Sequence, residues 1–196
     1  MKALPKQMTG RLLFYLLALV ATLVLVACNG VGSSSSLAPP TPHVPVEAMK
    51  MYSTSWYTIR YPAGWTKKEI TAEWVLFFDP AGDYSMAIHS WFNPEASISV
   101  DSVAEHGLIA LRDRQPVHLP LTILLAGQRW SQRAAIGWVY GYRKRALIEA
   151  VSLAANPTQS SGTVTYSIIY DALAPRFTQA VKLYFAPMLQ SFRFTA

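Results

Sequence analysis

The sequence opens with a basic and then strongly apolar segment that cannot belong to an ordinary globular core. Residues 1–11 carry Lys2, Lys6 and Arg11 and no acidic residue, and the sixteen residues from Leu12 to Ala27 carry no charge. A basic start followed by an apolar core is typical of a secretory signal. The folded body must therefore be built from the residues that follow, and we expect it on the extracytoplasmic side.

The apolar run ends at Cys28, the only cysteine among 196 residues. The stretch Leu25-Val26-Ala27-Cys28 resembles the lipobox of bacterial lipoproteins, in which the cysteine receives a diacylglyceryl group and the signal peptide is removed before it. The resemblance implies a mature chain that begins at Cys28 and is held in the cell membrane by acyl chains such as palmitate. An uncleaved transmembrane anchor is the alternative, although a span needs about 20 apolar residues.

The next segment is predicted to be a linker. Glycine and serine come first, and four prolines follow between residues 39 and 45. Such a composition cannot bury a core, and its proline part should be extended at about 3.1 Å per residue. We therefore divide the chain into a signal peptide at 1–27, a lipidated linker at 28–50 and a globular domain at 51–196.

The first half of the domain is predicted to contain several strands and then one helix. Runs rich in aromatic and β-branched residues, separated by Pro and Gly turns, predict strands at 56–61, 65–71, 73–78 and 84–92. In residues 97–114 the apolar side chains change to helical spacing. Either Ser99 or Ser102 could cap the start of this helix, and Pro116 should end it.

The second half is predicted to be mostly β-structure with a closing helix. The expected strands are 121–125, 128–135, 138–154 and 163–170, of which the third could form one long strand or two. A turn near Gly127 should join the first pair. Residues 175–194 place large apolar side chains near one helical face, and Pro187 should kink this helix or divide it. The order of elements predicts an α+β fold in which helices cover an antiparallel sheet.

Several stretches of the domain resemble PsbP-like domains in their order and spacing. They are Tyr57–Trp65, Val75–Pro80, Ala126–Trp130, Thr165–Ser167 and Leu189–Arg193. The resemblance covers residues 52–195 and implies an α/β/α sandwich around an antiparallel sheet. This family includes extrinsic proteins of photosystem II and bacterial lipoproteins without known activity, so it implies architecture more than function. The ion-linked residues of its photosynthetic members cannot be mapped onto this chain.

Catalytic and metal-binding motifs were sought without success. The sequence has no nucleophile elbow, P-loop or dinucleotide fingerprint. Its four histidines do not pair at metal-ligand spacing; they are His43, His89, His106 and His118. Asp79 and Asp83 flank Gly82 in a predicted turn, which explains these acids more simply than a calcium site does. We therefore expect no enzyme activity, no metal and no cofactor.

A basic and aromatic segment is the strongest candidate for a partner-binding surface. We call it the basic-aromatic segment; its members are Arg129, Trp130, Arg133, Trp138, Tyr140, Tyr142, Arg143 and Arg145. In a regular strand Trp138, Tyr140 and Tyr142 would share one face. Arg143 and Arg145 would then lie on the other. Ordinary alternation, with rings packed inward and charges in solvent, explains the same pattern.

On an exported domain this segment could meet an acidic envelope protein or an anionic lipid surface. Export argues against a nucleic acid, although aromatic rings between basic residues also suit single strands. The favoured hypothesis is a membrane-anchored, non-catalytic binding or assembly module. An envelope enzyme with an unrecognised site and a carrier of a small apolar ligand are the alternatives. The sequence leaves the partner, the membrane of residence and the oligomeric state open.

Overall fold

The computed structural model describes the chain in four stretches, residues 49–93, 99–139, 145–153 and 164–195. The chain divides into two units, Met1–Thr41 and Pro42–Ala196, and every described residue belongs to the second. The predicted signal peptide and Cys28 lie outside the described residues. Within the four stretches, no helix combines the length and the apolar character that a membrane crossing requires.

The described residues are mostly β-strand. In chain order they form β1 (Met49–Ser53), β2 (Tyr57–Pro62), β3 (Thr66–Thr71), β4 (Trp74–Phe78), β5 (Tyr84–Phe92), α2 (Val100–His106), β6 (Leu111–Pro116), β7 (Thr122–Leu125), β8 (Gln128–Val139), β9 (Arg145–Leu153), β10 (Val164–Leu173), the 3₁₀ turn η2 (Ala174–Arg176), α3 (Phe177–Ala180), the π-helical segment η3 (Val181–Phe185), α4 (Ala186–Ser191) and β11 (Arg193–Phe194). Strands β2 to β5 confirm the four strands predicted for the first half. Strand β1 begins at Met49, two residues before the predicted start of the domain at residue 51.

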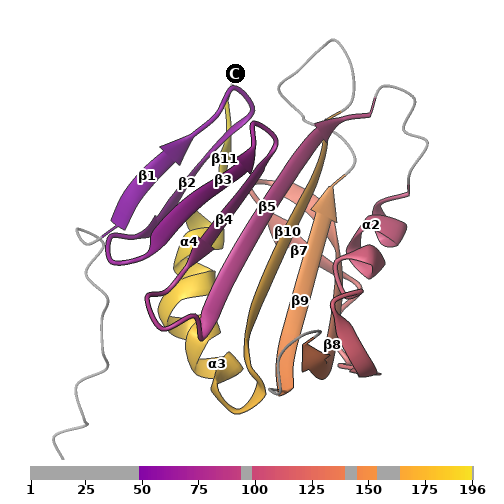
Figure 1. Cartoon of the computed structure of the whole chain (residues 1–196). Coiled ribbons are helices and arrows are strands. Elements are labelled where there is room, and N and C mark those ends of the chain that lie inside the picture. Colours follow the sequence, from indigo (N-terminus) through magenta and orange to yellow (C-terminus); the bar gives the residue numbers. More distant parts are fainter. Residues whose placement is uncertain (1–48, 94–98, 140–144, 154–163, 196) are drawn as a thin grey trace, which may run out of the picture. The chain divides into compact units, whose positions relative to one another are not determined.

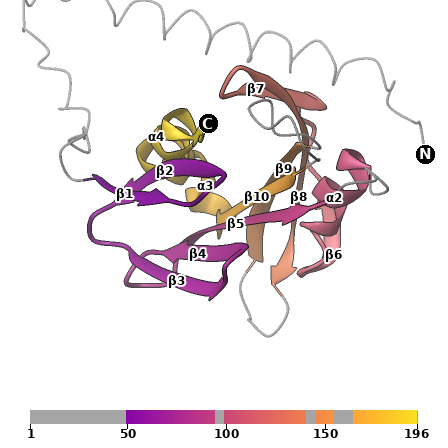
Figure 2. The ribbon, with the colours of Figure 1, turned by 90° about the horizontal axis from the view of Figure 1, so that it is seen from above.

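Two antiparallel sheets organise these strands (Figures 1 and 2). The larger sheet has eight strands in the order β3-β4-β5-β10-β9-β8-β6, with β7 paired to β8 beside this path. The smaller sheet has the order β1-β2-β11. Strand β10 lies between β5 and β9, although α2 and four strands separate it from β5 in the chain. A large antiparallel sheet with few helices agrees, at this coarse level, with the predicted α+β class.

One face of the large sheet packs against the C-terminal helical segments and the small sheet, and we call it the closed face. Figure 1 shows α3 and α4 behind the large sheet on this side. The main hydrophobic core lies here, because every second side chain of the central strands points toward these covering elements. Its fully buried large side chains include Phe77, Met86, Ile88, Trp130, Tyr166 and Ile168.

The opposite face carries α2, and we call it the open face. Helix α2 packs over β8, β9 and part of β10, and it encloses a second, smaller core. The buried residues of this core are Leu108, Leu111, Ala135, Ile148 and Ala150. Gly107 ends the helix close to the sheet, since an added Cβ would lie 2.8 Å from the Cβ of Ala150. On β4 and β5 the side chains of this face stay partly exposed.

The closing helix is divided, as the position of Pro187 in the sequence predicted. Segments α3 and α4 are joined by the π-helical η3, and Pro187 lies in the first turn of α4. Proline lacks an N–H group and crowds the preceding turn, which a wider π turn relieves. Four predicted apolar positions are buried on the closed face, namely Phe177, Phe185, Met188 and Phe192.

The predicted helix at 97–114 is wrong beyond His106. Helix α2 begins with Ser99 as its N-cap, whose side chain accepts a hydrogen bond from the N–H of Ser102 at 3.1 Å. It ends at Gly107, and the chain then forms β6 from Leu111 onward. Pairing with β8 supplies β6 with backbone partners outside its own segment, and this tertiary pairing overrides the helical spacing of the apolar side chains.

The hairpin predicted near Gly127 is confirmed. Ala126 and Gly127 both adopt positive φ, at 49° and 76°, between the paired strands β7 and β8. The stretch 138–154 forms two strands rather than one, because β8 ends at Val139 and β9 returns beside it from Arg145. Tyr140, Tyr142 and Arg143 lie between them, outside the described residues.

Candidate binding site

The basic-aromatic segment is divided among three environments. The prediction that Trp130 belongs to a partner-binding surface is wrong, because Trp130 is fully buried on the closed face at 0% exposure. Its indole N–H donates to the carbonyl of Leu125 at 3.0 Å, and its ring packs against Tyr166 and Phe192. Burial with a satisfied N–H is the usual state of a core tryptophan. Trp130 therefore serves the fold.

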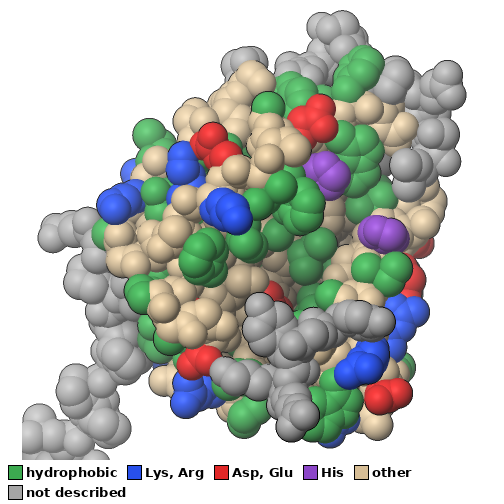
Figure 3. Space-filling model, in the orientation of Figure 1, with side chains coloured by type: hydrophobic (Ala, Val, Ile, Leu, Met, Phe, Trp, Pro, Cys, Tyr) green, Lys and Arg blue, Asp and Glu red, His purple; other side chains and the backbone are tan. Residues whose placement is uncertain are grey.

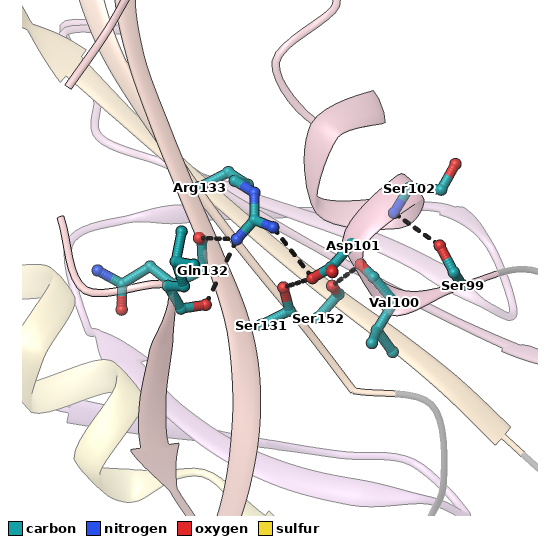
Figure 4. Close-up of polar contacts among 9 residues, drawn as sticks. Ser99, Val100, Asp101, Ser102, Ser131, Gln132, Arg133 and Ser152 are labelled. Atoms are coloured by element: carbon teal, nitrogen blue, oxygen red, sulfur yellow. Dashed lines mark hydrogen bonds and ion pairs between the residues drawn. The ribbon is translucent and has the colours of Figure 1, made fainter. Parts of the chain in front are cut away.

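Arg133 is half-buried and holds α2 on the sheet (Figure 4). Its guanidinium forms an ion pair with Asp101 at 3.2 Å and donates to the carbonyls of Gln132 at 2.7 Å and Leu121 at 3.4 Å. The hydroxyl of Ser131 also donates to Asp101. With these contacts made inside the domain, Arg133 is a structural residue rather than a free cation on a surface.

Trp138 and Arg145 are direct cross-strand partners, so they lie on the same face of the sheet. This overturns the expectation that they lie on opposite faces, and the reason is the reversal of the chain between β8 and β9. Trp138 is 43% exposed, and Arg145 donates to the side chain of Gln115 at 2.8 Å. Arg129 is exposed at the other end of β8, about 30 Å away along the strand.

The open face brings together side chains that the sequence analysis did not connect. Three rows of direct cross-strand partners run over β4, β5 and β10: Trp74–His89–Ser167, Leu76–Ala87–Ile169 and Phe78–Ser85–Asp171. Partners in such a row point to the same side of the sheet. Figure 3 shows hydrophobic side chains gathered on this face, around a hollow over the middle of the sheet.

An aromatic row lies at one end of the open face. The ring of His89 lies 5.9 Å from that of Trp74 and 4.6 Å from that of Trp91, centroid to centroid. Trp74 is 44% exposed, and the other two rings are half-buried. Burial lowers the pKa of His89, and the nearby carboxylate of Glu73 opposes this shift. The lowered pKa favours the uncharged imidazole, and the three rings form one aromatic surface.

The floor beside the aromatic row is built from small side chains. Ala87 on β5 and Ser167 on β10 are short; Ala87 is the cross-strand partner of Leu76 on β4, and Ser167 is the partner of His89 on β5. At the far end the hydroxyl of Ser85 donates to the carboxyl of Asp171. Burial raises the pKa of Asp171, and this hydrogen bond lowers it in part. The open face thus has rings at one end and a hydrogen-bonded carboxyl at the other.

A separate pocket of about 530 Å³ lies between α2, β6 and β8. Its walls are mostly apolar and include Leu108, Leu119, Leu121 and Ala135, while polar side chains stand at its rim. One rim pair is Arg114 and Glu105, which form an ion pair at 3.0 Å. In the described stretches, no three side chains among His, Cys, Asp and Glu are grouped as a metal site would need.

The sequence contained a weak signal for the open face. Trp74 and Trp91 occupy alternate positions to the buried Val75 and Ile88, which marks them as residues of the opposite face. The sequence does not reveal the register in which β4 pairs with β5. It therefore could not show that Trp74 and His89 lie side by side. Adjacent strands in sequence often pair, but register depends on the tertiary packing.

Comparisons with known proteins bear on the fold. No family model matches the chain, and no curated protein matches its sequence. Among solved structures the domain is similar to LpqN, which is involved in cell envelope biogenesis of Mycobacterium tuberculosis. The two structures align with a TM-score of 0.50 and 13% sequence identity, and the alignment covers 81% of this chain and 100% of LpqN. The Ran-binding protein Mog1p of Saccharomyces cerevisiae aligns with a TM-score of 0.44 and 12% identity, over 74% of this chain and 95% of Mog1p. The fold of this domain is therefore similar to that of LpqN.

Proposed function

We propose that this chain is a non-catalytic binding module of the cell envelope, anchored in the membrane by lipid on Cys28 and docking a partner protein on its open face. The lipobox-like stretch that ends at Cys28 supports the anchor. The PsbP-like order of motifs supports the α/β/α layering. The similarity in fold to LpqN, a protein of cell envelope biogenesis, supports a role in the envelope.

The aromatic row of Trp74, His89 and Trp91 is the observation that carries this proposal. The ring of His89 lies in tilted contact with both tryptophan rings, and all three side chains remain partly exposed to solvent. The cores of protein interfaces are enriched in aromatic side chains and depleted of charge, and tryptophan is prominent among the residues that dominate binding energy. Rings left open on a folded domain suit a partner that covers them.

The rows of the open face could form the centre of a protein interface. The rows span three strands and run from Ser85 to Trp91 along β5, which gives an area of about 10 Å by 20 Å. A standard interface buries about 800 Å² on each side. The aromatic row would therefore form the central part of a larger interface.

Site-specific photo-crosslinking in the native host tests the docking face. A photoreactive phenylalanine analogue at position 74 of the full chain should give a discrete adduct with one envelope protein, since Trp74 would lie at the interface centre. Position 138 is the matched control, because Trp138 has almost the same exposure, 43% against 44%. Trp91→Ala in the same chain should abolish the adduct.

An adduct from position 138 and none from position 74 would overturn the docking face and favour the basic-aromatic segment. The anchor is tested by the intact mass of the protein extracted from membranes. Loss of residues 1–27 with added acyl mass is the expected result. A retained leader with an unmodified Cys28 would contradict the lipid anchor and leave the docking face to be judged by crosslinking alone.

A further inference from the structure

We propose that the pocket between α2, β6 and β8 binds a single-chain amphiphile with a carboxylate head, and that Arg114 is the residue that receives the head. This inference does not depend on the docking face, because the pocket and the aromatic row share no residue. The pocket volume of about 530 Å³ lies within the range of small-molecule sites.

The walls of the pocket match an acyl chain. Leu108 and Ala135 belong to the small core and form an apolar base, and Leu119 lies beside them in the segment between β6 and β7. Leu121 also lines the pocket and is 67% exposed, which leaves an apolar side chain at the mouth. An apolar lining that includes an exposed leucine can remove a hydrocarbon tail from water.

The rim of the pocket favours a negative head group. Arg114, His118 and Arg133 line it, whereas Glu105 is the one acidic side chain in the lining. Arg133 pairs with Asp101 and donates to two backbone carbonyls, so its charge is balanced within the domain. Arg114 is therefore the cation of the lining that a negative head group would approach.

Arg114 can exchange its partner for a ligand. Its pair with Glu105 joins two half-exposed side chains at 3.0 Å, and exposed pairs of this kind are weak. A carboxylate can accept two parallel hydrogen bonds from a guanidinium. The ion pair with Glu105 shows that a carboxylate oxygen can reach the guanidinium at this position. In the free protein Arg114 thus pairs with Glu105, and the carboxylate head of the ligand competes with Glu105 for the guanidinium.

Octanoate binding to the full chain in zwitterionic lipid nanodiscs tests the proposal. Isothermal titration should show saturable binding after subtraction of the heat from empty nanodiscs, which accounts for octanoate that enters the lipid. Octylammonium and octanol, which share the tail, should bind more weakly by about tenfold or more. Equal binding of octanoate and octylammonium would overturn the proposal, as would no binding of octanoate.

Two variants separate a direct role of Arg114 from a structural one. Arg114→Ala should weaken octanoate binding by about tenfold. Glu105→Gln should tighten it by about threefold, because the competing carboxylate is removed. Arg112→Ala, on the same strand but outside the pocket lining, is the control and should leave binding unchanged. A loss of affinity in Glu105→Gln, or an unchanged Arg114→Ala, would overturn the assignment.

Discussion

The two faces of the eight-stranded sheet are made from alternate residues of the same strands, yet they differ in their cover. On the closed face Phe77, Met86 and Ile88 are fully buried under the C-terminal helical segments and the small sheet. Their neighbours on the open face, such as Leu76 and His89, remain partly exposed. An antiparallel sheet needs only one packed face to be stable, so the other face is available for binding.

The same residue type therefore has opposite roles on the two faces. Trp130 packs among Tyr166, Phe192 and Phe194 on the closed face, where its N–H is also satisfied. Trp74 contacts His89 in a tilted arrangement on the open face and is 44% exposed. The comparison predicts that stability depends on the closed face, while the open face can be altered without unfolding the domain.

The largest expected effect is on the closed face. Trp130→Ala should lower the free energy of unfolding by about 3–5 kcal/mol, because it removes a fully buried indole and leaves a cavity. Chemical denaturation monitored by far-UV circular dichroism measures this loss. Trp130→Phe keeps most of the ring and should cost less. A change below about 1 kcal/mol for Trp130→Ala would mean that the closed face is not the main source of stability.

The next largest effect on stability is expected where α2 packs against the open face. In Gly107→Ala the new Cβ would lie 2.8 Å from the Cβ of Ala150 and 3.1 Å from Ile169, so the helix end must move. Overpacking of this kind costs about 1–3 kcal/mol. Gly64→Ala is the matched control, since no atom lies within 4 Å of the added Cβ, and its unfolding midpoint should hardly change. Equal unfolding midpoints for both variants would show that the end of α2 does not pack tightly against the sheet.

A smaller effect concerns pH and compares a carboxyl on each face. Burial raises the pKa of Asp171 on the open face and of Glu149 on the closed face, where Tyr170 donates a hydrogen bond that opposes the shift. The folded state then holds these protons more tightly than the unfolded state. The free energy of unfolding should therefore fall as the pH rises above about 4, through the ordinary range and up to the raised pKa.

Asp171→Asn should remove the part of the fall in unfolding free energy that Asp171 causes. The native chain should therefore lose stability relative to the variant as the pH rises. Glu149→Gln should behave in the same way. Denaturant midpoints measured from pH 3.5 upward test both, with the variants and native chain in the same buffers. A difference between native and variant chains that stays constant with pH, or grows in the opposite direction, would contradict the raised pKa of that carboxyl.

The smallest effect on stability is expected from the aromatic row itself. Trp74→Ala should change the free energy of unfolding by less than about 1 kcal/mol, because nearly half of the side chain is already in solvent. The same denaturation measurement checks this, and Trp138→Ala provides a tryptophan of equal exposure on another surface. A loss comparable to that of Trp130→Ala would erase the distinction between the two faces.

Local signals in the sequence were reliable where the cause is local. The turn at Gly127 joins β7 to β8 and Pro187 interrupts the closing helix, as predicted, and Ser99, one of the two predicted caps, begins α2. Each depends on a residue's own backbone preference or on a hydrogen bond within one turn. Runs of aromatic and β-branched residues between Pro and Gly turns also identified strands β2 to β5, because these residue preferences act locally.

The errors arose where a distant segment decided the outcome. Leu111 has helical spacing from Leu108, but pairing with β8 draws it into β6. Trp130 was grouped with its basic neighbours, yet alternation along β8 sends it into the core beside Phe192. Arg145 was placed opposite Trp138, whereas the return of the chain in β9 sets the two side by side. In each case strand partners are chosen by the burial of the whole sheet.

The sequence by itself determined most of the element types other than β6, the main turns and the prediction of an exported, lipid-anchored chain, because these follow from local residue patterns. Only the tertiary structure decided that β10 lies between β5 and β9, which tryptophan is buried and which face of the sheet stays open. The reason is that covering one face requires the C-terminal segments and the small sheet to arrive from both ends of the domain. Their arrival leaves Trp74, His89 and Trp91 together on the other face.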